Sequence, residues 1–225
     1  MARSIETSQL TVARAAAALF LQRGLAATSG ADIAEAAGIS ERTVWRYFHN
    51  KESCVAPLFA KSWKYYAEEL RRWPHFQSIE AHLAECFDLA KQPPEWIADG
   101  LLIVRLIATL PDEPDLRPVW LASYHRGEDE LAAIIGDRLG RSHGDFDVRL
   151  CAAAVLAAIR VIDETISIAA IRYAQEFTTA EVVAQTAKSI RAVSHLPFCD
   201  PVEPRPFGGS GPMLSPDAER AGRTE

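Results

Sequence analysis

The segment from Thr28 to Lys51, TSGADIAEAAGISERTVWRYFHNK, constrains the fold more than any other part of the chain. It predicts two short helices that meet at Gly38, because glycine provides the backbone freedom required at a helix C-terminus and a tight turn. Ser29 can cap the first helix, with Asp32 at the spacing of a capping box, and Ser40 can cap the second. An ordinary helical hairpin is the alternative. The coincidence of the turn glycine, both caps and a polar outer face favours a helix-turn-helix.

The second of these helices is expected to have one buried and one exposed face. Val44 and Phe48 lie four residues apart, so they share a face and are predicted to point inward. Polar, basic and aromatic side chains remain for the outside. A helix that enters the major groove of DNA needs this division, and the pattern therefore predicts a recognition helix.

The residues from about Thr11 to Val55 resemble the DNA-binding domain of TetR-family transcriptional regulators. The resemblance includes a preceding helix, VARAAAALFLQRGLAATS, then IAEAAGIS, then RTVWRYF and the pair Lys51-Glu52. The sequence departs from the family pattern at Gly30, where the family has an apolar residue, and at Trp45, where it has a tyrosine that contacts phosphate. ISERTVWRYF is also similar to an actinobacterial subgroup, some of whose members sense acyl-CoA-like ligands.

The resemblance implies an all-α protein in which a three-helix helix-turn-helix domain (residues 1–52) precedes a larger helical ligand-binding and dimerisation domain (residues 53–196). It implies a cytoplasmic, sequence-specific regulator, a repressor that a small-molecule effector releases from a palindromic double-stranded DNA operator. No cofactor is expected besides that effector. Six prolines and four glycines among the last 30 residues predict that 197–225 is a disordered tail. The alternative function is a helical protein-interaction module without sequence-specific DNA binding.

The candidate DNA contacts divide by chemistry. Arg42 and Arg46 are the candidates to read base edges, because a guanidinium can donate two hydrogen bonds to guanine, and Arg42 also suits a phosphate. Glu41 is either an acceptor for a cytosine amino group or a favourable charge at the helix start. The residues better placed for phosphates are Thr43, Tyr47, Lys51 and Ser29. The complete predicted set is Ser29, Glu41, Arg42, Thr43, Trp45, Arg46, Tyr47 and Lys51.

The charge distribution restricts where DNA can bind. The chain carries a net charge of −6, but residues 1–55 hold six basic and five acidic residues, a balance of +1. DNA contact is therefore expected to rest on a local patch around Arg42, Arg46 and Lys51, and binding should weaken with salt.

The rest of the chain shows helix-length segments and no strand alternation. The run CAAAVLAAIRVIDETISIAAI, within a helix predicted from about 146 to 175, is apolar around much of its circumference and must be buried on more than one side. The resemblance favours a homodimer formed by the last two long helices of each subunit. The alternative is that this helix is the central core helix of a monomer.

The ligand site is less constrained. Arg105 interrupts an apolar helix, so either a neighbouring carboxylate or solvent compensates its charge, or it binds an anion. Arg160 has Asp163 and Glu164 at ion-pair spacing on the same helix. Aromatic side chains are candidates to line an apolar pocket, although each also fits an ordinary core. The candidate ligand-binding set is Trp63, Tyr66, Phe87, Trp96, Arg105, Trp120 and Tyr124.

Several function classes are disfavoured. The chain contains no GxSxG, GxxxxGK, HExxH or Rossmann glycine pattern, so an enzyme is not expected. Its histidines lack metal-ligand spacing, which argues against a metal site. Charged residues interrupt its longest apolar runs, which argues against a membrane span. The four cysteines form no CxxC pair and are expected to be free thiols in a reducing cytoplasm: Cys54, Cys86, Cys151 and Cys199.

Overall fold

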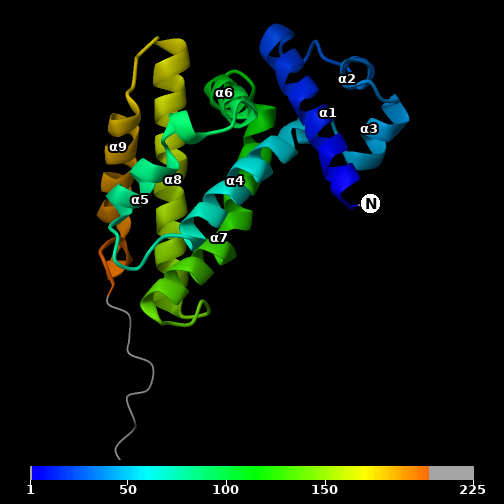
Figure 1. The fold of residues 1–225 in the computed structure, drawn as a ribbon. Helices are drawn as coiled ribbons and strands as arrows, with labels where there is room; N and C mark the ends of the chain where they lie inside the picture. The colour runs from blue at the N-terminus through cyan, green and yellow to red at the C-terminus, as the bar shows by residue number, and fades with distance from the viewer. Residues whose placement is uncertain (1, 203–225) are drawn as a thin grey trace, which may run out of the picture.

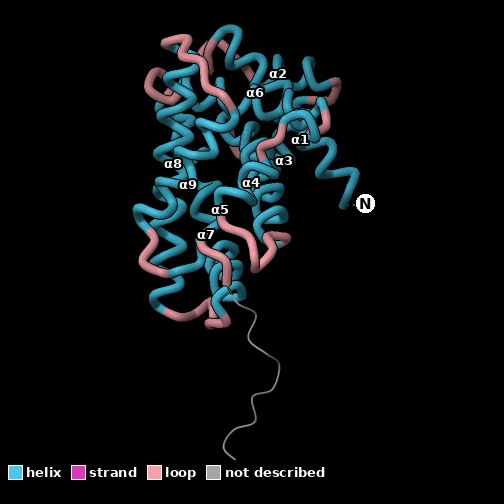
Figure 2. Tube along the Cα trace, turned by 60° about the vertical axis from the view of Figure 1, so that its left-hand side comes forward, coloured by secondary structure: helices cyan, strands magenta, loops and turns pink. Residues whose placement is uncertain are grey.

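The computed structural model describes residues 2–202, and Figure 2 shows helices and loops but no strand in that range. The all-α prediction is confirmed. The helices are α1 (Ala2–Arg23), α2 (Gly30–Ala37), α3 (Glu41–Tyr47), α4 (Ala56–Arg71), α5 (Ile79–Cys86), α6 (Pro94–Thr109), α7 (Arg117–Leu139), α8 (Phe146–Arg172) and α9 (Thr179–Val193). Short 3-10 helices lie at Glu52–Val55, Leu89–Lys91, Pro114–Leu116 and Pro197–Cys199.

The end of α7 and the starts of α8 and α9 follow signals that the sequence contains. Gly140 ends α7 in the left-handed region at φ 63°, where a side chain with a Cβ atom is strained. The Asp145 carboxylate accepts a hydrogen bond from the backbone N–H of Asp147 and caps α8. Thr178 and Glu181 form a reciprocal capping box at the start of α9.

The helical pattern from Lys51 to Trp73 does not form one helix. The 3-10 turn Glu52–Val55 comes first, and α4 begins after it with Pro57 in its first turn. Proline is favoured there because the first turn of a helix needs no backbone donor. Pro57 therefore helps to start α4.

Helices α1, α2 and α3 form a head at one end of the molecule (Figure 1). Val44 and Phe48 are buried, as their spacing predicts, and they pack with Ile33 of α2 and Val12 of α1. Burying these apolar side chains holds the two short helices against α1, because helices of seven or eight residues are not stable alone.

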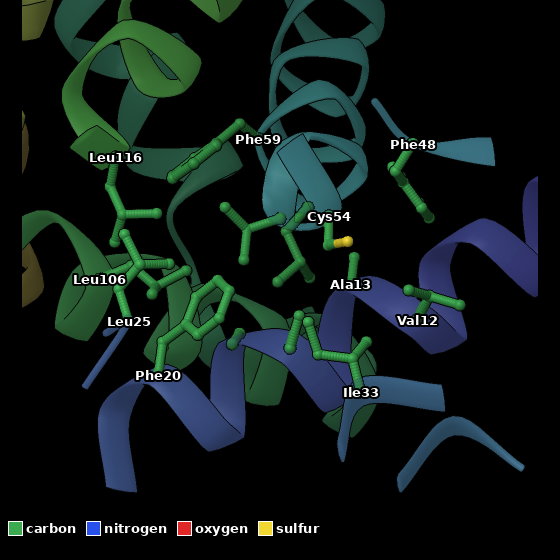
Figure 3. Packing of buried hydrophobic residues seen from close by; sticks show 14 of the residues in the cluster. Val12, Ala13, Phe20, Leu25, Ile33, Phe48, Cys54, Phe59, Leu106 and Leu116 are labelled. Atoms are coloured by element: carbon green, nitrogen blue, oxygen red, sulfur yellow. The ribbon is translucent and has the colours of Figure 1, made fainter. Parts of the chain in front are cut away.

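The hydrophobic core of the head continues into the body. Figure 3 shows Phe20 and Leu25 of the head in the same cluster as Phe59 of α4, Leu106 of α6 and Leu116. Because these side chains are buried together, a displacement of α4 or α6 must be accommodated by the packing under the head.

A buried carboxylate adds an ionic link between head and body. Asp99 of α6 accepts two hydrogen bonds from Arg14 of α1, at 2.6 and 2.8 Å, and one at 2.6 Å from Lys61 of α4. Burial alone raises the pKa of Asp99, but the hydrogen bonds from Arg14 and Lys61 outweigh it, so the pKa lies below its usual value. Asp99 therefore joins three helices as a charged group.

The body consists of α4–α9, with α8 packed against α6, α7 and α9. Figure 1 shows α8 and α9 side by side on the edge of the body opposite the head. A second core cluster fills this region and includes Trp73, Ile135, Val155, Ala187 and Phe198.

The sequence predicts a disordered tail from residue 197, but residues 197–199 form a 3-10 helix that packs against the body. Phe198 and Cys199 are buried, and the guanidinium of Arg138 donates to the carbonyl oxygens of Phe198 and Asp200. The same guanidinium also binds three carbonyls between α4 and α5 and lies 3.7 Å from the centroid of a Trp73 ring. A buried cation thus anchors residues 198–200 to the body. Residues 203–225 lie outside the described range.

Candidate DNA interface and ligand cavity

The two helices of the predicted helix-turn-helix are capped as their sequence requires. Ser29 and Asp32 form a capping box at the start of α2, with the Asp32 carboxylate 2.8 Å from the Ser29 backbone nitrogen. Gly38 ends α2 at φ 67°. The Ser40 hydroxyl then accepts from the backbone N–H of Thr43 and begins α3. These contacts set the direction of α3 relative to α2.

Helix α3 presents its basic side chains outward. Arg42 and Arg46 are exposed, whereas Thr43 and Tyr47 are half-buried. Arg46 donates to the Tyr47 hydroxyl at 3.2 Å, and its guanidinium carbon lies 5.0 Å from the centroid of that ring. Tyr47 thus holds the guanidinium of Arg46, one of the two arginines that the sequence analysis predicts to contact base edges.

The two departures from the family pattern contact each other. Gly30 is the first residue of α2, and the indole of Trp45 lies directly over it. A Cβ atom at Gly30 would be only 2.0 Å from Cζ2 of Trp45, so only glycine leaves room for the ring. The indole N–H donates to the Glu41 carboxylate at 3.1 Å, although 42% of the Trp45 surface remains exposed.

Two of the predicted phosphate contacts are already used within the head. The Lys51 ammonium donates to the carbonyl oxygens of Leu25 and Thr28 at 2.6 and 3.3 Å, and so holds the loop before α2. The Ser29 hydroxyl donates to Asp32 at 2.6 Å. Hydrogen bonds from Ser29, together with Arg23, lower the pKa of Asp32 to about 2. Both residues therefore shape the start of α2.

The sequence of this head matches a known family. Residues 13–58, which run from within α1 to the first turn of α4, match the profile described as "Bacterial regulatory proteins, tetR family". Residues 13–58 thus form the DNA-binding segment that is typical of TetR-family transcriptional regulators. The match indicates a DNA-binding transcriptional regulator.

Solved structures share the fold of this chain. A TetR-family transcriptional regulator from Mesorhizobium loti is 22% identical, with a TM-score of 0.50 over 83% of this chain and 95% of that one. FadR from Thermus thermophilus, a TetR-family repressor solved in complex with lauroyl-CoA, is 20% identical, with a TM-score of 0.52 over 90% of this chain and 100% of that one. No curated protein sequence matches the chain.

The body contains a cavity of about 120 Å³ that is lined by residues of α4, α5, α6, α7, α8 and α9. The structure brings together five of the aromatic side chains that the sequence analysis selected, and these line the cavity: Trp63, Tyr66, Phe87, Trp120 and Tyr124. Trp96 lines a second cavity of about 270 Å³ beside it. The two cavities share the side chains of Tyr66 and Phe87, whose ring centroids are 5.6 Å apart.

One wall of the first cavity depends on a glycine. A Cβ atom at Gly127 of α7 would lie 2.5 Å from the indole of Trp63, so the missing side chain lets α7 approach α4. The Trp63 indole N–H donates to Glu130 at 2.6 Å, and Arg71 pairs with the same carboxylate. These contacts hold the ring in one orientation.

Arg105 does not take part in either cavity. It is exposed on α6 and lines neither of them, so solvent compensates its charge. The buried charge of α6 is instead Asp99, which the sequence analysis did not select. Arg105 interrupts the apolar pattern because that face of α6 reaches water.

The cavity contains a carboxylate that the sequence analysis assigned elsewhere. Asp163 and Glu164 were both expected as ion-pair partners of Arg160. The pair forms with Glu164 at 3.9 Å, whereas Asp163 lines both cavities. The Tyr124 hydroxyl donates to it at 2.5 Å. The helical spacing of α8 is the signal that would have identified Asp163. It lies four residues after Ile159, which also lines the cavity, so both side chains share one face of the helix.

Other chemical classes find no support in the part of the chain that is described. No group of three or more metal-binding side chains occurs there, and no helix in that range is long and apolar enough to cross a membrane. The four cysteines are free and buried, and burial raises the pKa of the Cys54 and Cys86 thiols to about 12. Such thiols are poor nucleophiles at neutral pH.

Proposed function

We propose that this regulator is a ligand-responsive repressor that acts as a homodimer in the cytoplasm, with DNA-binding domain 1–52 and ligand-binding and dimerisation domain 53–196. The observation that carries the proposal is the exposed pair Arg42 and Arg46 on a capped helix whose core continues toward an aromatic cavity. Each subunit places α3 in a major groove, and the two copies read half-sites about one helical turn apart.

The predicted DNA contacts take separate roles in this proposal. Arg42 and Arg46 reach base edges, and Thr43 and Tyr47 contact phosphates. Lys51 also contacts phosphate, through the ammonium N–H groups that its contacts inside the head leave available, and Ser29 lies beside it at the start of α2. Because the Trp45 N–H is bound to Glu41 in the free protein, both side chains meet DNA as one unit.

The proposed dimer forms through α8 and α9. Phe146, Leu150, Ala157 and Val161 follow helical spacing along one face of α8, and all four are exposed. An apolar stripe of this length on a free surface is unusual for a monomer. A second copy that packs α8 and α9 against it as a four-helix bundle would remove it from water.

Residues shared between the cavity and the head core provide the route for release. Phe59, Ile107 and Trp120 line the cavity and also belong to the cluster that includes Phe20 and Ile33 of the head. A ligand that displaces these side chains must shift packing under the head, and α4 transmits the shift to α3. Release then requires that the ligand prefers the arrangement that does not fit the operator.

DNA selection tests the proposal directly. We would incubate the purified dimer with a random fragment pool at physiological salt and sequence the retained DNA. We expect an enriched, near-palindromic motif with two half-sites. Absence of any enriched motif from a folded dimer would contradict the proposal and favour the alternative of a helical protein-interaction module.

The Arg46→Ala variant tests the role of the recognition helix. We expect operator binding to weaken by about 1–3 kcal/mol and sequence preference to relax at one position in each half-site, because a bidentate base contact is lost. Arg105→Ala is the matched control, since Arg105 is an exposed arginine on α6. Fluorescence anisotropy with labelled operator measures both. Equal losses in the two variants would show that only overall charge matters.

A further inference from the structure

The charges that line the first cavity have one sign. Its lining residues include the carboxylate of Asp163 but no lysine, arginine or histidine. The adjoining cavity is lined by Lys61, but the Lys61 ammonium is 2.6 Å from Asp99, which is buried beside it. Among the described lining residues, no cation is left to balance Asp163.

Arg160, three residues before Asp163 on α8, is paired with the next residue, Glu164. Glu164 pairs with Arg117 of α7 and with Arg160 of α8. Asp163 instead lines the cavity, where it accepts a hydrogen bond from the Tyr124 hydroxyl at 2.5 Å. An ionised carboxylate in an apolar site without a counter-charge is unfavourable, so a positive group beside Asp163 would be stabilised there.

The cavity walls also suit a positive charge. Six aromatic side chains line the space that Asp163 faces, and ring faces carry partial negative charge that attracts cations. The Trp120 and Tyr124 rings meet edge to face with centroids 5.4 Å apart, next to the carboxylate. A carboxylate combined with aromatic walls recognises a hydrophobic ammonium better than it recognises any neutral or anionic compound.

We propose that the effector of this regulator is a hydrophobic organic cation, an amine or quaternary ammonium whose charged group lies at Asp163 and whose apolar part fills the aromatic cavity. This inference rests on the proposed function, because it names the ligand class of the same cavity. The second cavity, which shares Ser62, Tyr66 and Asp163 with the first, accepts the longer part of such a molecule.

The proposal separates this chain from a structural neighbour. Thermus thermophilus FadR was solved with lauroyl-CoA, which is an anionic thioester. A fatty acyl carboxylate or a phosphate placed near Asp163 would meet a like charge in a low-dielectric site. The aromatic lining is compatible with an acyl chain, so the charge of the head group, and not the apolar part, distinguishes the two ligand classes.

Matched amphiphiles test the ligand class. We would titrate the full-length dimer with decyltrimethylammonium, decanol, decanoate and lauroyl-CoA, each below its micelle concentration, by isothermal titration calorimetry. We expect the ammonium to bind about tenfold more tightly than decanol, which is a difference of about 1.4 kcal/mol, and decanoate to bind more weakly than decanol. Tighter binding of decanoate or lauroyl-CoA than of the ammonium would overturn the proposal.

The Asp163→Asn variant tests whether the ammonium group of the ligand binds at Asp163. Asparagine has nearly the same shape, and we expect the ammonium to lose its advantage over decanol. The control is Asp147→Asn, which removes a carboxylate from the same helix but outside both cavities, and which should keep that advantage. An advantage that persists in Asp163→Asn, with the fold verified by circular dichroism, would place the cation elsewhere and refute the assignment.

A parallel measurement of operator binding keeps the two proposals apart. We expect decyltrimethylammonium to release operator DNA from the wild-type dimer and not from Asp163→Asn. Release by lauroyl-CoA alone would overturn the cation assignment and leave the ligand-responsive repressor intact. Binding of the ammonium without any release of DNA would support the cation site and contradict the release mechanism.

Discussion

At the scale of single residues, the unusual positions in the head depend on one another. Trp45 occupies the place where the family has a tyrosine, and its indole fits only because residue 30 is glycine. The indole N–H then holds Glu41 at the start of α3. Trp45 therefore contacts Gly30 and Glu41, where the family has a tyrosine that contacts phosphate. These contacts position the N-terminal turn of α3 against α2.

Gly30→Ala tests this dependence. The new Cβ atom forces the Trp45 ring away from α2 and separates it from Glu41, and overpacking of this kind costs about 1–3 kcal/mol. We expect operator affinity to fall about tenfold, measured by anisotropy. Gly100→Ala is the control, because nothing lies within 4 Å of a Cβ atom there and the helix gains propensity. Unchanged affinity in Gly30→Ala would mean that the position of Trp45 does not matter for DNA.

Asp163→Asn has a second expected effect, in the absence of any ligand. Burial raises the pKa of Asp163 to about 6, above its ordinary value of 3.8. The ionised form is therefore disfavoured in the folded state, and this carboxyl favours folding below about pH 4 but lowers stability as the pH rises through 6. We expect Asp163→Asn to stabilise the protein by about 2 kcal/mol at pH 7.5 and by less at pH 5. Thermal melts at the two pH values measure this, and a variant less stable than wild type at both would contradict it.

At the scale of elements, α4 and α6 connect the head to the cavity. Asp99 joins α1, α4 and α6 through Arg14 and Lys61, and Lys61 and Asp99 also line the second cavity. Phe59 of α4 lies in the first cavity and in the core under the head. A ligand that moves α4 or α6 thus acts on packing and on an ion network together.

Asp99→Asn tests the ionic link. We expect a loss of about 2 kcal/mol of unfolding free energy at pH 7, measured by chemical denaturation, because two charged donors lose a buried acceptor charge. The pKa of Asp99 is lowered, so this contribution is present at neutral pH and disappears as the pH falls below the usual carboxyl range. Asp112→Asn, which breaks an exposed pair with Arg172, should cost much less. Equal costs would show that burial of Asp99 has no energetic consequence.

Element boundaries in this chain were largely predictable, and the exceptions have local causes. Caps at Ser29, Ser40 and Asp145 and the stop at Gly140 act through the nearest few residues, so the sequence contains them. The 3-10 turn before Pro57 and the anchored residues 198–200 were not predicted. Arg138 anchors the second segment from about 60 positions away, and sequence separation conceals such a contact.

At the scale of the whole molecule, the exposed face of α8 sets the expected assembly. Val161 is 52% exposed in the middle of this helix, opposite the cavity side. We expect Val161→Glu to dissociate the dimer, because a buried unpaired carboxylate at a helix interface is strongly unfavourable. Light scattering after size exclusion measures the mass. Phe76→Glu, on an exposed residue between α4 and α5, should remain dimeric, and dissociation of both variants would remove the case for the α8 face.

The sequence alone determined the all-α class, the helix-turn-helix and the outward placement of Arg42 and Arg46, because caps, turn glycines and helical spacing act over a few residues. It also selected aromatic side chains that line the cavity. The tertiary structure decided which charges those rings surround. Arg105 and Asp163 both interrupt apolar helices, and spacing along one helix cannot tell which of them reaches solvent. The packing of α6, α7 and α8 exposes Arg105, directs both neighbouring arginines to Glu164 and leaves Asp163 facing the cavity.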